Sequence, residues 1–241
     1  MIEDNASLQP AAQLQRVYTA DVLSNRLNLE HRWGKPCLSY FACMRPGMAA
    51  AKGLAGVQDA IGDQPALLRV PPAALHTSLV WLLPVHEEFT VPKDDLWAEQ
   101  EPRWLAIFRQ VLASLPRFRL SFTQVVATDT AVIAVASAPN QAGELRRRLT
   151  RCLDLPWLSS SGSLVHTTLF RYRGALGDPA SFLRHVRALE VTVHMAVREV
   201  LILREMVFPS LQYEIVHRFP LPTRGKLLSM DNPAPRTQAT A

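Results

Sequence analysis

Apolar and polar residues follow each other along this chain in a pattern that predicts a mixture of strands and helices. Apolar residues at every second position, or in short continuous runs, are typical of strands, whereas a spacing of three to four is typical of amphipathic helices. Helices are expected at 48–64, 95–115, 142–155 and 181–189, with Asn140 and Asp178 as N-caps of the last two. Strands are expected at 37–44, 66–70, 75–83, 118–127, 131–137, 164–172, 191–200, 201–208 and 212–221.

The order of these elements repeats. A helix, a strand that carries a histidine, another helix and further strands occur in the first half of the chain and again in the second half. So many neighbouring strands favour an α+β fold with antiparallel sheets over a doubly wound parallel sheet. Residues 1–35 are predicted to be an N-terminal helical extension, and residues 222–241, which carry few large apolar side chains, a disordered tail.

Composition is that of an ordinary globular protein, with 48% hydrophobic and 20% charged residues among 241. The cysteines, Cys37, Cys43 and Cys152, are odd in number and widely spaced, so we expect reduced thiols rather than a disulfide framework or a zinc site. An acidic, polar N-terminus and the lack of an apolar run of about 20 residues predict a cytoplasmic protein with no membrane span. The net charge of +5 fits either an anionic partner or a basic surface that serves solubility.

One tetrapeptide pattern, His-x-Ser/Thr-hydrophobic, occurs twice, beginning at His76 and at His166. Because side chains alternate between the faces of a strand, His76 shares a face with Ser78, and His166 shares a face with Thr168. Each strand thus presents one imidazole together with one hydroxyl and leaves its other face to pack on helices. Two such matches on similar strands are a much stronger signal than either match alone.

This set of groups suits phosphodiester chemistry. A neutral imidazole can take a proton from an attacking water or hydroxyl, and an imidazolium can give one to the departing oxygen. The Ser and Thr hydroxyls can donate hydrogen bonds to the phosphate oxygens on which charge accumulates. The pattern therefore predicts a phosphodiesterase that needs neither metal nor cofactor and has a bell-shaped pH–rate profile.

The two motifs, their separation and the order of elements resemble the two-histidine (2H) phosphoesterase superfamily. The resemblance spans about residues 36–221 and is closest to the bacterial RNA 2′,3′-cyclic phosphodiesterases, also called the 2′-5′ RNA ligase group. It implies two pseudo-symmetric lobes, each an antiparallel sheet backed by helices, that enclose a central cleft. It also implies that His76 and His166 act as acid and base, with Ser78 and Thr168 as phosphate ligands.

Further side chains are candidates for the cleft. Arg171 stands where RNA-processing members of the superfamily often have an arginine, which makes it a candidate phosphate ligand. Simple alternation turns Arg171 away from His166, so that it needs a β-bulge or its long side chain to reach the cleft. Phe170 shares the parity of His166, and it and Tyr40 are candidates for stacking on a substrate base. Trp81 has the parity of the packing face and is expected in the core.

The sequence also departs from the superfamily. The middle positions of the motifs are Thr77 and Thr167, where the superfamily commonly has an aliphatic residue, and segment 84–103 is an addition that can reshape the cleft mouth. The remaining histidines, which lack a hydroxyl two positions on, are expected at the surface or in satisfied positions: His31, His86, His185, His194 and His217. Four arginines crowd one predicted helix and form either a solvated face or a contact to an RNA backbone: Arg146, Arg147, Arg148 and Arg151.

The predicted function is to open a cyclic phosphodiester, of the nucleoside or RNA 2′,3′-cyclic phosphate class, to a monoester. The partner is then a nucleotide or an RNA end that bears the cyclic phosphate. Two alternatives stay open: a 2H enzyme that acts on a 2′-5′ linkage or a small-molecule phosphodiester, and a non-catalytic RNA- or nucleotide-binding protein on the same fold. There is no Gly-rich phosphate loop and no GxSxG elbow, which argues against a nucleotide kinase and an α/β-hydrolase.

Overall fold

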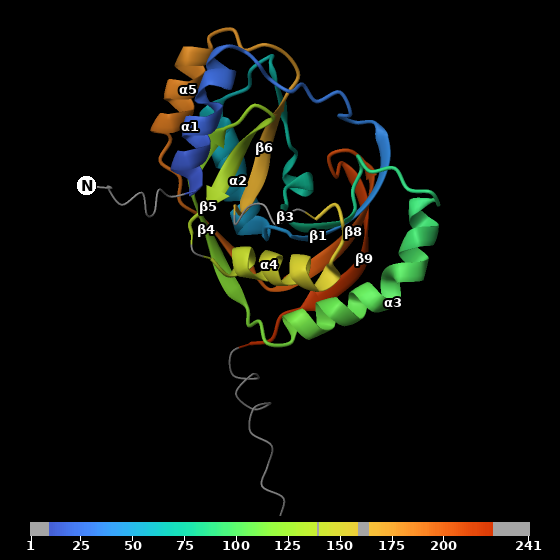
Figure 1. Cartoon of the computed structure of the whole chain (residues 1–241). Helices are drawn as coiled ribbons and strands as arrows, with labels where there is room; N and C mark the ends of the chain where they lie inside the picture. Colours follow the sequence, from blue (N-terminus) through green and yellow to red (C-terminus); the bar gives the residue numbers. More distant parts are fainter. Residues whose placement is uncertain (1–9, 139, 159–163, 224–241) are drawn as a thin grey trace, which may run out of the picture.

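The computed structural model of the chain describes residues 10–138, 140–158 and 164–223, so the predicted tail lies outside the described residues except for its first two positions (Figure 1). Each predicted strand and helix is present. In chain order the elements are α1 (Pro10–Leu23), β1 (Pro36–Met44), α2 (Met48–Ile61), β2 (Leu67–Arg69), the 3-10 helix η1 (Pro72–Ala74), β3 (Thr77–Leu83), α3 (Lys93–Leu112), β4 (Phe118–Ala127), β5 (Ala131–Ala136), α4 (Gln141–Leu153), β6 (His166–Tyr172), α5 (Pro179–Ala188), β7 (Val193–Val197), β8 (Glu199–Val207) and β9 (Gln212–Pro220).

The strands form two antiparallel sheets, which confirms the predicted α+β class. Sheet A has the order β3-β1-β8-β9, and sheet B has the order β2-β6-β5-β4-β7. The two histidine motifs lie in different sheets, on β3 and at the start of β6. Each sheet takes strands from both halves of the sequence, because β2 joins sheet B while β8 and β9 join sheet A. The lobes are therefore interleaved rather than consecutive.

Local sequence signals begin the helices of the second half. The Asn140 side chain accepts a hydrogen bond from the backbone N–H of Gly143 at 2.8 Å, and the Asp178 side chain accepts one from the N–H of Ser181 at 2.9 Å. Each of these bonds satisfies a donor that the first helical turn leaves free. Pro179 then occupies the first position of α5, where its missing N–H costs nothing. Both predicted caps are confirmed.

The helices that follow β1 and β5 pack on the sheet of the other lobe. Helix α2 lies on β6 and β7 of sheet B, and α4 lies on β3 of sheet A beside α3. The approach of α2 to β7 is close, since a Cβ atom at Gly53 would lie 3.1 Å from the Val193 side chain. Gly53 weakens the helix propensity of this segment, but it allows the helix to reach the sheet.

The N-terminal extension is helical only in part. Helix α1 packs on β4 and against α5 (Figure 1), and residues 24–35, which we call the strap, then run from sheet B to sheet A. At sheet B, the N–H of Glu30 donates to the carbonyl of Tyr172 at 2.7 Å. At sheet A, the N–H of Gly34 donates to the carbonyl of Phe208 at 2.8 Å. The strap therefore spans the two sheets.

One continuous apolar core joins α2, α3, α4 and α5 to both sheets, with Trp104, Phe108 and Tyr172 among its largest buried side chains. A second cluster lies between α1 and β5, where Ala11 packs near Ile133. None of the helices within the described ranges is long and apolar enough to cross a membrane.

Candidate active site

A β-bulge at the last residue of each motif decides which later residues face the cleft. In β3, Ser78 and Val80 pair with the adjacent residues Cys43 and Ala42, so that Leu79 is the extra residue. An extra residue reverses the alternation of all the side chains after it. Trp81 consequently emerges on the same side as Ser78, opposite to the expectation from simple alternation.

The second motif has its bulge at the matching position. Thr168 and Phe170 pair with the adjacent residues Ile133 and Val132, so that Leu169 is the extra residue. Arg171 thereby returns to the face of Thr168. This is the bulge that the sequence required if Arg171 was to reach the cleft.

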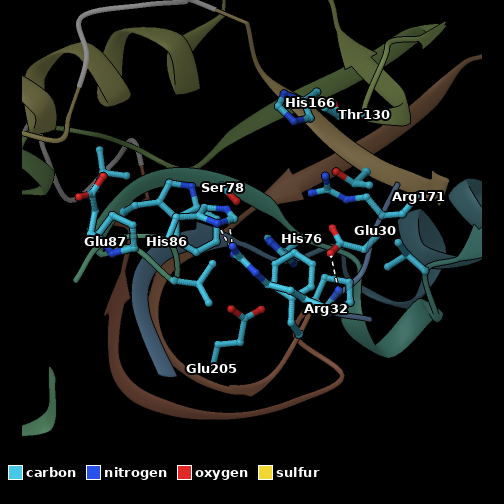
Figure 2. Close-up of a pocket in the computed structure, with 18 of the residues that line it drawn as sticks. Glu30, Arg32, His76, Ser78, His86, Glu87, Thr130, His166, Arg171 and Glu205 are labelled. Atoms are coloured by element: carbon cyan, nitrogen blue, oxygen red, sulfur yellow. Dashed lines mark hydrogen bonds between the residues drawn. The ribbon is translucent and has the colours of Figure 1, made fainter. Parts of the chain in front are cut away.

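One cavity of about 780 Å³ brings the two motifs together. Five of the seven residues predicted from the sequence line it, and these are His76, Ser78, His166, Thr168 and Arg171. Figure 2 labels all of them except Thr168. A volume of this size is typical of a site for a small molecule or nucleotide. Within the described ranges, no three His, Cys, Asp or Glu side chains are arranged to hold a metal ion.

His76 is held by a hydrogen bond and by an aromatic neighbour. Its Nδ1 lies 2.8 Å from the carbonyl oxygen of Ala74, so Nδ1–H donates to that oxygen and Nε2 is free to accept a proton. Its ring lies 5.0 Å from the ring of Phe41. The pKa of His76 is lowered to about 4, mainly by burial and also by the positive charges of Arg45 and Arg171, against the raising effect of the hydrogen bond to the Ala74 carbonyl.

The pKa of His166 is lowered as well. Burial lowers the pKa of His166 to about 4, and the charges of Arg146 and Arg171 act in the same sense. The charge of His76 also lowers the pKa of His166, which means that the two imidazoles interact. The Leu164 carbonyl raises the pKa of His166 in part, although the buried Nδ1 has no partner of good hydrogen-bond geometry among the described residues. Both imidazoles are therefore neutral at pH 7.

Arg171 is a half-buried cation whose charge interacts with two carboxylates. Its Nε is buried without a hydrogen-bond partner among the described residues, and its guanidinium lies 5.9 Å from the ring of Phe208. Burial lowers the pKa of Arg171, whereas Glu30 of the strap and Glu205 of β8 raise it. Glu205 is held in turn, since it accepts a 2.8 Å hydrogen bond from Ser39 Oγ. A buried guanidinium with an unused donor suits an anionic ligand.

The structure corrects the two predicted stacking residues. Phe170 is 1% exposed in the apolar core, because the bulge at Leu169 turns it away from the cleft. Tyr40 is 3% exposed on the other face of sheet A, where it stacks on Trp97 at 4.5 Å and donates to the Asp94 carboxylate at 2.6 Å. Neither residue lines the cavity.

Two residues expected elsewhere belong to the cavity wall. Trp81 is half-buried there, and the indole N–H of Trp157 donates to its carbonyl at 3.1 Å. Arg146 points inward rather than to solvent, unlike Arg147, which is exposed. Its Nη2 donates to the carbonyl of Ser78 at 2.6 Å. The bulge at Leu79 accounts for the position of the Trp81 side chain in the cavity wall. The packing of α4 on β3 accounts for the position of Arg146.

The strap adds charged side chains that the motifs did not predict. Glu30 and Arg32 line the cavity, and the guanidinium of Arg32 contacts the ring of His86 in the loop after β3 (Figure 2). The backbone N–H of Arg32 donates to the Glu30 carboxylate at 3.0 Å. The N-terminal extension and the segment after β3 thus meet at the cavity.

No protein-family model matches the chain, and no curated protein matches it either. Several solved structures are similar to the chain. TT0787 of Thermus thermophilus is similar with a TM-score of 0.59 and 17% identity, over 77% of this chain and 99% of that one. A phosphoesterase is similar with a TM-score of 0.57 and 16% identity, over 77% of this chain and 99% of the other. LigT of E. coli in complex with 3′-AMP is similar with a TM-score of 0.51 and 15% identity, over 78% of this chain and 99% of LigT.

The chain therefore shares its fold with TT0787, LigT and this phosphoesterase, which agrees with the two-sheet α+β fold that the resemblance implied. Each of the three neighbours is covered almost completely, whereas the remainder of this chain lies outside the match. The fold is shared with these proteins, and the chemistry has to be argued from the side chains of this cleft.

Proposed function

We propose that this chain is a phosphoesterase that opens a cyclic phosphodiester, of the nucleoside or RNA 2′,3′-cyclic phosphate class, to a phosphomonoester. One of His76 and His166 takes a proton from water as the water oxygen attacks phosphorus. The other gives a proton to the 2′ or 3′ oxygen as its bond to phosphorus breaks. The observation that carries this proposal is the convergence of both imidazoles, both motif hydroxyls and Arg171 on one cavity.

The proposal requires one of the two imidazoles to be protonated when the substrate is bound. Their pKa values of about 4 leave both neutral at pH 7 before an anion binds. A phosphodiester carries a negative charge, and a negative charge within a few ångström favours the imidazolium form. Because the imidazoles repel each other when both are charged, one proton is shared by the pair. Substrate binding thus supplies the acid that the reaction needs.

Trp81 supports a nucleoside substrate. Its half-buried indole lines the same cavity as the imidazoles, five positions after His76, and the hydrogen bond from Trp157 fixes its backbone. An aromatic face at a polar cleft can stack on a nucleobase, a contact worth about 1–3 kcal/mol per base. LigT of E. coli, which shares the fold, has been solved with 3′-AMP, ATP and NADP+.

The test is incubation with 2′,3′-cyclic AMP in excess EDTA, with the monophosphate product quantified by chromatography. The unmodified chain should turn the substrate over. His76→Gln and His166→Gln should each reduce kcat by roughly 10²- to 10⁴-fold, since each removes one proton-transfer group. His194→Gln is the matched control, because His194 is exposed on the edge strand β7, hydrogen-bonds to Ser121 on β4 and does not line the cavity.

Each negative outcome of this assay would contradict a different part of the proposal. Tight binding of the nucleotide without turnover would point to a binding protein on the same fold. Turnover that EDTA abolishes would refute the metal-independent mechanism. Equal activity of the His76→Gln chain and the unmodified chain would refute the assigned acid–base pair.

A further inference from the structure

The middle residues of the two motifs touch each other. Thr77 and Thr167 are both 0% exposed, and their hydroxyl oxygens lie 2.7 Å apart, which is the usual length of a hydrogen bond between two hydroxyls. Each of them directly follows a catalytic histidine. We propose that this Thr77–Thr167 pair is a positioning device that sets the separation of His76 and His166, a role that rests on the proposed function.

A side-chain link is needed here because the backbone supplies none. β3 belongs to sheet A and β6 to sheet B, and the two strands share no ladder of backbone hydrogen bonds. The register between the motifs is therefore not fixed by strand pairing, as it is within each sheet. The bond between Thr77 and Thr167 is a direct connection from one motif to the other.

Arg146 adds a second link between the same strands. Its Nη2 donates to the carbonyl of Ser78 at 2.6 Å, its Nε donates to the carbonyl of Leu79 at 3.1 Å, and its Nη1 donates to the carbonyl of Leu164. The first two carbonyls belong to the first motif, and the third lies two residues before His166. The motifs are thus joined by the threonine hydroxyls and by the guanidinium.

The hydroxyl pair sets a shorter distance than an apolar pair would. Two methyl carbons in contact lie about 3.5–4.0 Å apart, whereas the Thr77 and Thr167 oxygens lie 2.7 Å apart. Replacing both hydroxyls by methyl groups moves the two strands apart by about 1 Å at this point. A misplacement of about 1 Å between reacting groups can reduce a rate about 100-fold.

The central experiment uses matched double variants and kinetics with 2′,3′-cyclic AMP. Thr77→Val with Thr167→Val should lower kcat about 10- to 100-fold and change KM by less than about 3-fold. It should lower the urea midpoint less than Val186→Ala does, because both polar partners are removed together and neither is left unpaired. Thr77→Ser with Thr167→Ser keeps the two hydroxyls and should keep kcat within about 3-fold.

The combination of stability and rate separates positioning from a merely structural role. Val186→Ala on α5, buried and remote from both motifs, provides a destabilised control that should keep kcat at a temperature where it is folded. The proposal is overturned if the valine pair keeps full kcat. It is equally overturned if the serine pair loses as much kcat as the valine pair.

A second readout needs no turnover. Inorganic phosphate in the cleft would contact both lobes, so the valine pair should bind it at least about 10-fold more weakly by calorimetry, and the serine pair should not. If the unmodified chain binds phosphate in this pattern but turns over no cyclic nucleotide, the proposed function fails and the positioning role stands. If turnover and phosphate binding are both unchanged in the valine pair, the positioning role alone fails. Absence of both in the unmodified chain overturns both.

Discussion

The stability of the fold should fall as the pH falls from 7 to 5, and the two cleft histidines should account for much of that fall. Each has a pKa of about 4 in the folded chain, against an ordinary value of 6.5 when the chain is unfolded. Between these two values the unfolded chain binds protons that the folded chain excludes. The histidines therefore stabilise the fold fully above pH 6.5 and progressively less as the pH drops toward 4.

The magnitude follows from the size of the shift. A pKa of about 4 against 6.5 implies that each imidazole contributes about 2 kcal/mol less to the free energy of unfolding at pH 5 than at pH 7. Water enters the cleft and weakens this effect, so we expect a loss of about 1–2 kcal/mol per imidazole. His86 and His217 also have lowered pKa values and add in the same direction. A comparison of variants isolates the cleft pair.

Urea unfolding at pH 7 and pH 5 measures this effect, with the unmodified chain beside His76→Gln and His166→Gln. Each variant should lose about 1–2 kcal/mol less than the unmodified chain over this interval, because glutamine does not titrate. Inorganic phosphate should also reduce the loss, since a bound anion raises the pKa of the imidazoles. The reasoning is refuted if the variants and the unmodified chain lose the same stability between the two pH values.

Three further outcomes follow from the cleft. Arg171→Ala should weaken the binding of inorganic phosphate roughly 10- to 100-fold in calorimetry, because a charge-assisted hydrogen bond is lost. Arg173→Ala, at an exposed position, should leave phosphate binding unchanged. Trp81→Ala should raise KM for 2′,3′-cyclic AMP about 10-fold with little change in kcat, and an unchanged KM would exclude stacking on Trp81. Arg146→Met should lower the free energy of unfolding by about 2–4 kcal/mol in urea, against less than about 0.5 kcal/mol for the exposed Arg147→Met.

Alternation and capping rules were sufficient to predict the elements and the centre of the site. They placed His76 with Ser78 and His166 with Thr168 because these pairs lie before the bulges, where the alternation of two still holds. The same rules failed beyond the bulges. Leucine at an extra position looks like leucine at a regular one, so nothing in the sequence marked the reversal at residues 79 and 169.

The remaining errors have tertiary causes. Arg146 looked like its solvated neighbours on the helix, and only the packing of α4 on the other lobe brings it to the carbonyls beside the motifs. Glu30 and Arg32 carry no motif, and they reach the cavity because the strap is anchored to both sheets. Residues that gain a role through long-range packing leave no local pattern to read.

Helix α2 packs on sheet B and helix α4 packs on sheet A, so each helix covers the sheet that carries the other histidine motif. This arrangement determines whether the chain can be cut into two fragments that fold. A cut between β3 and α3 would yield a first fragment whose α2 has lost β6 and β7, and a second fragment whose α4 has lost β3. Each fragment would expose an apolar helix face and an unpaired sheet edge, and so would aggregate when made alone. Made together, the two fragments would complement each other and rebuild the cleft. We therefore expect the two repeats to unfold together as one cooperative unit, with neither repeat stable as a domain by itself.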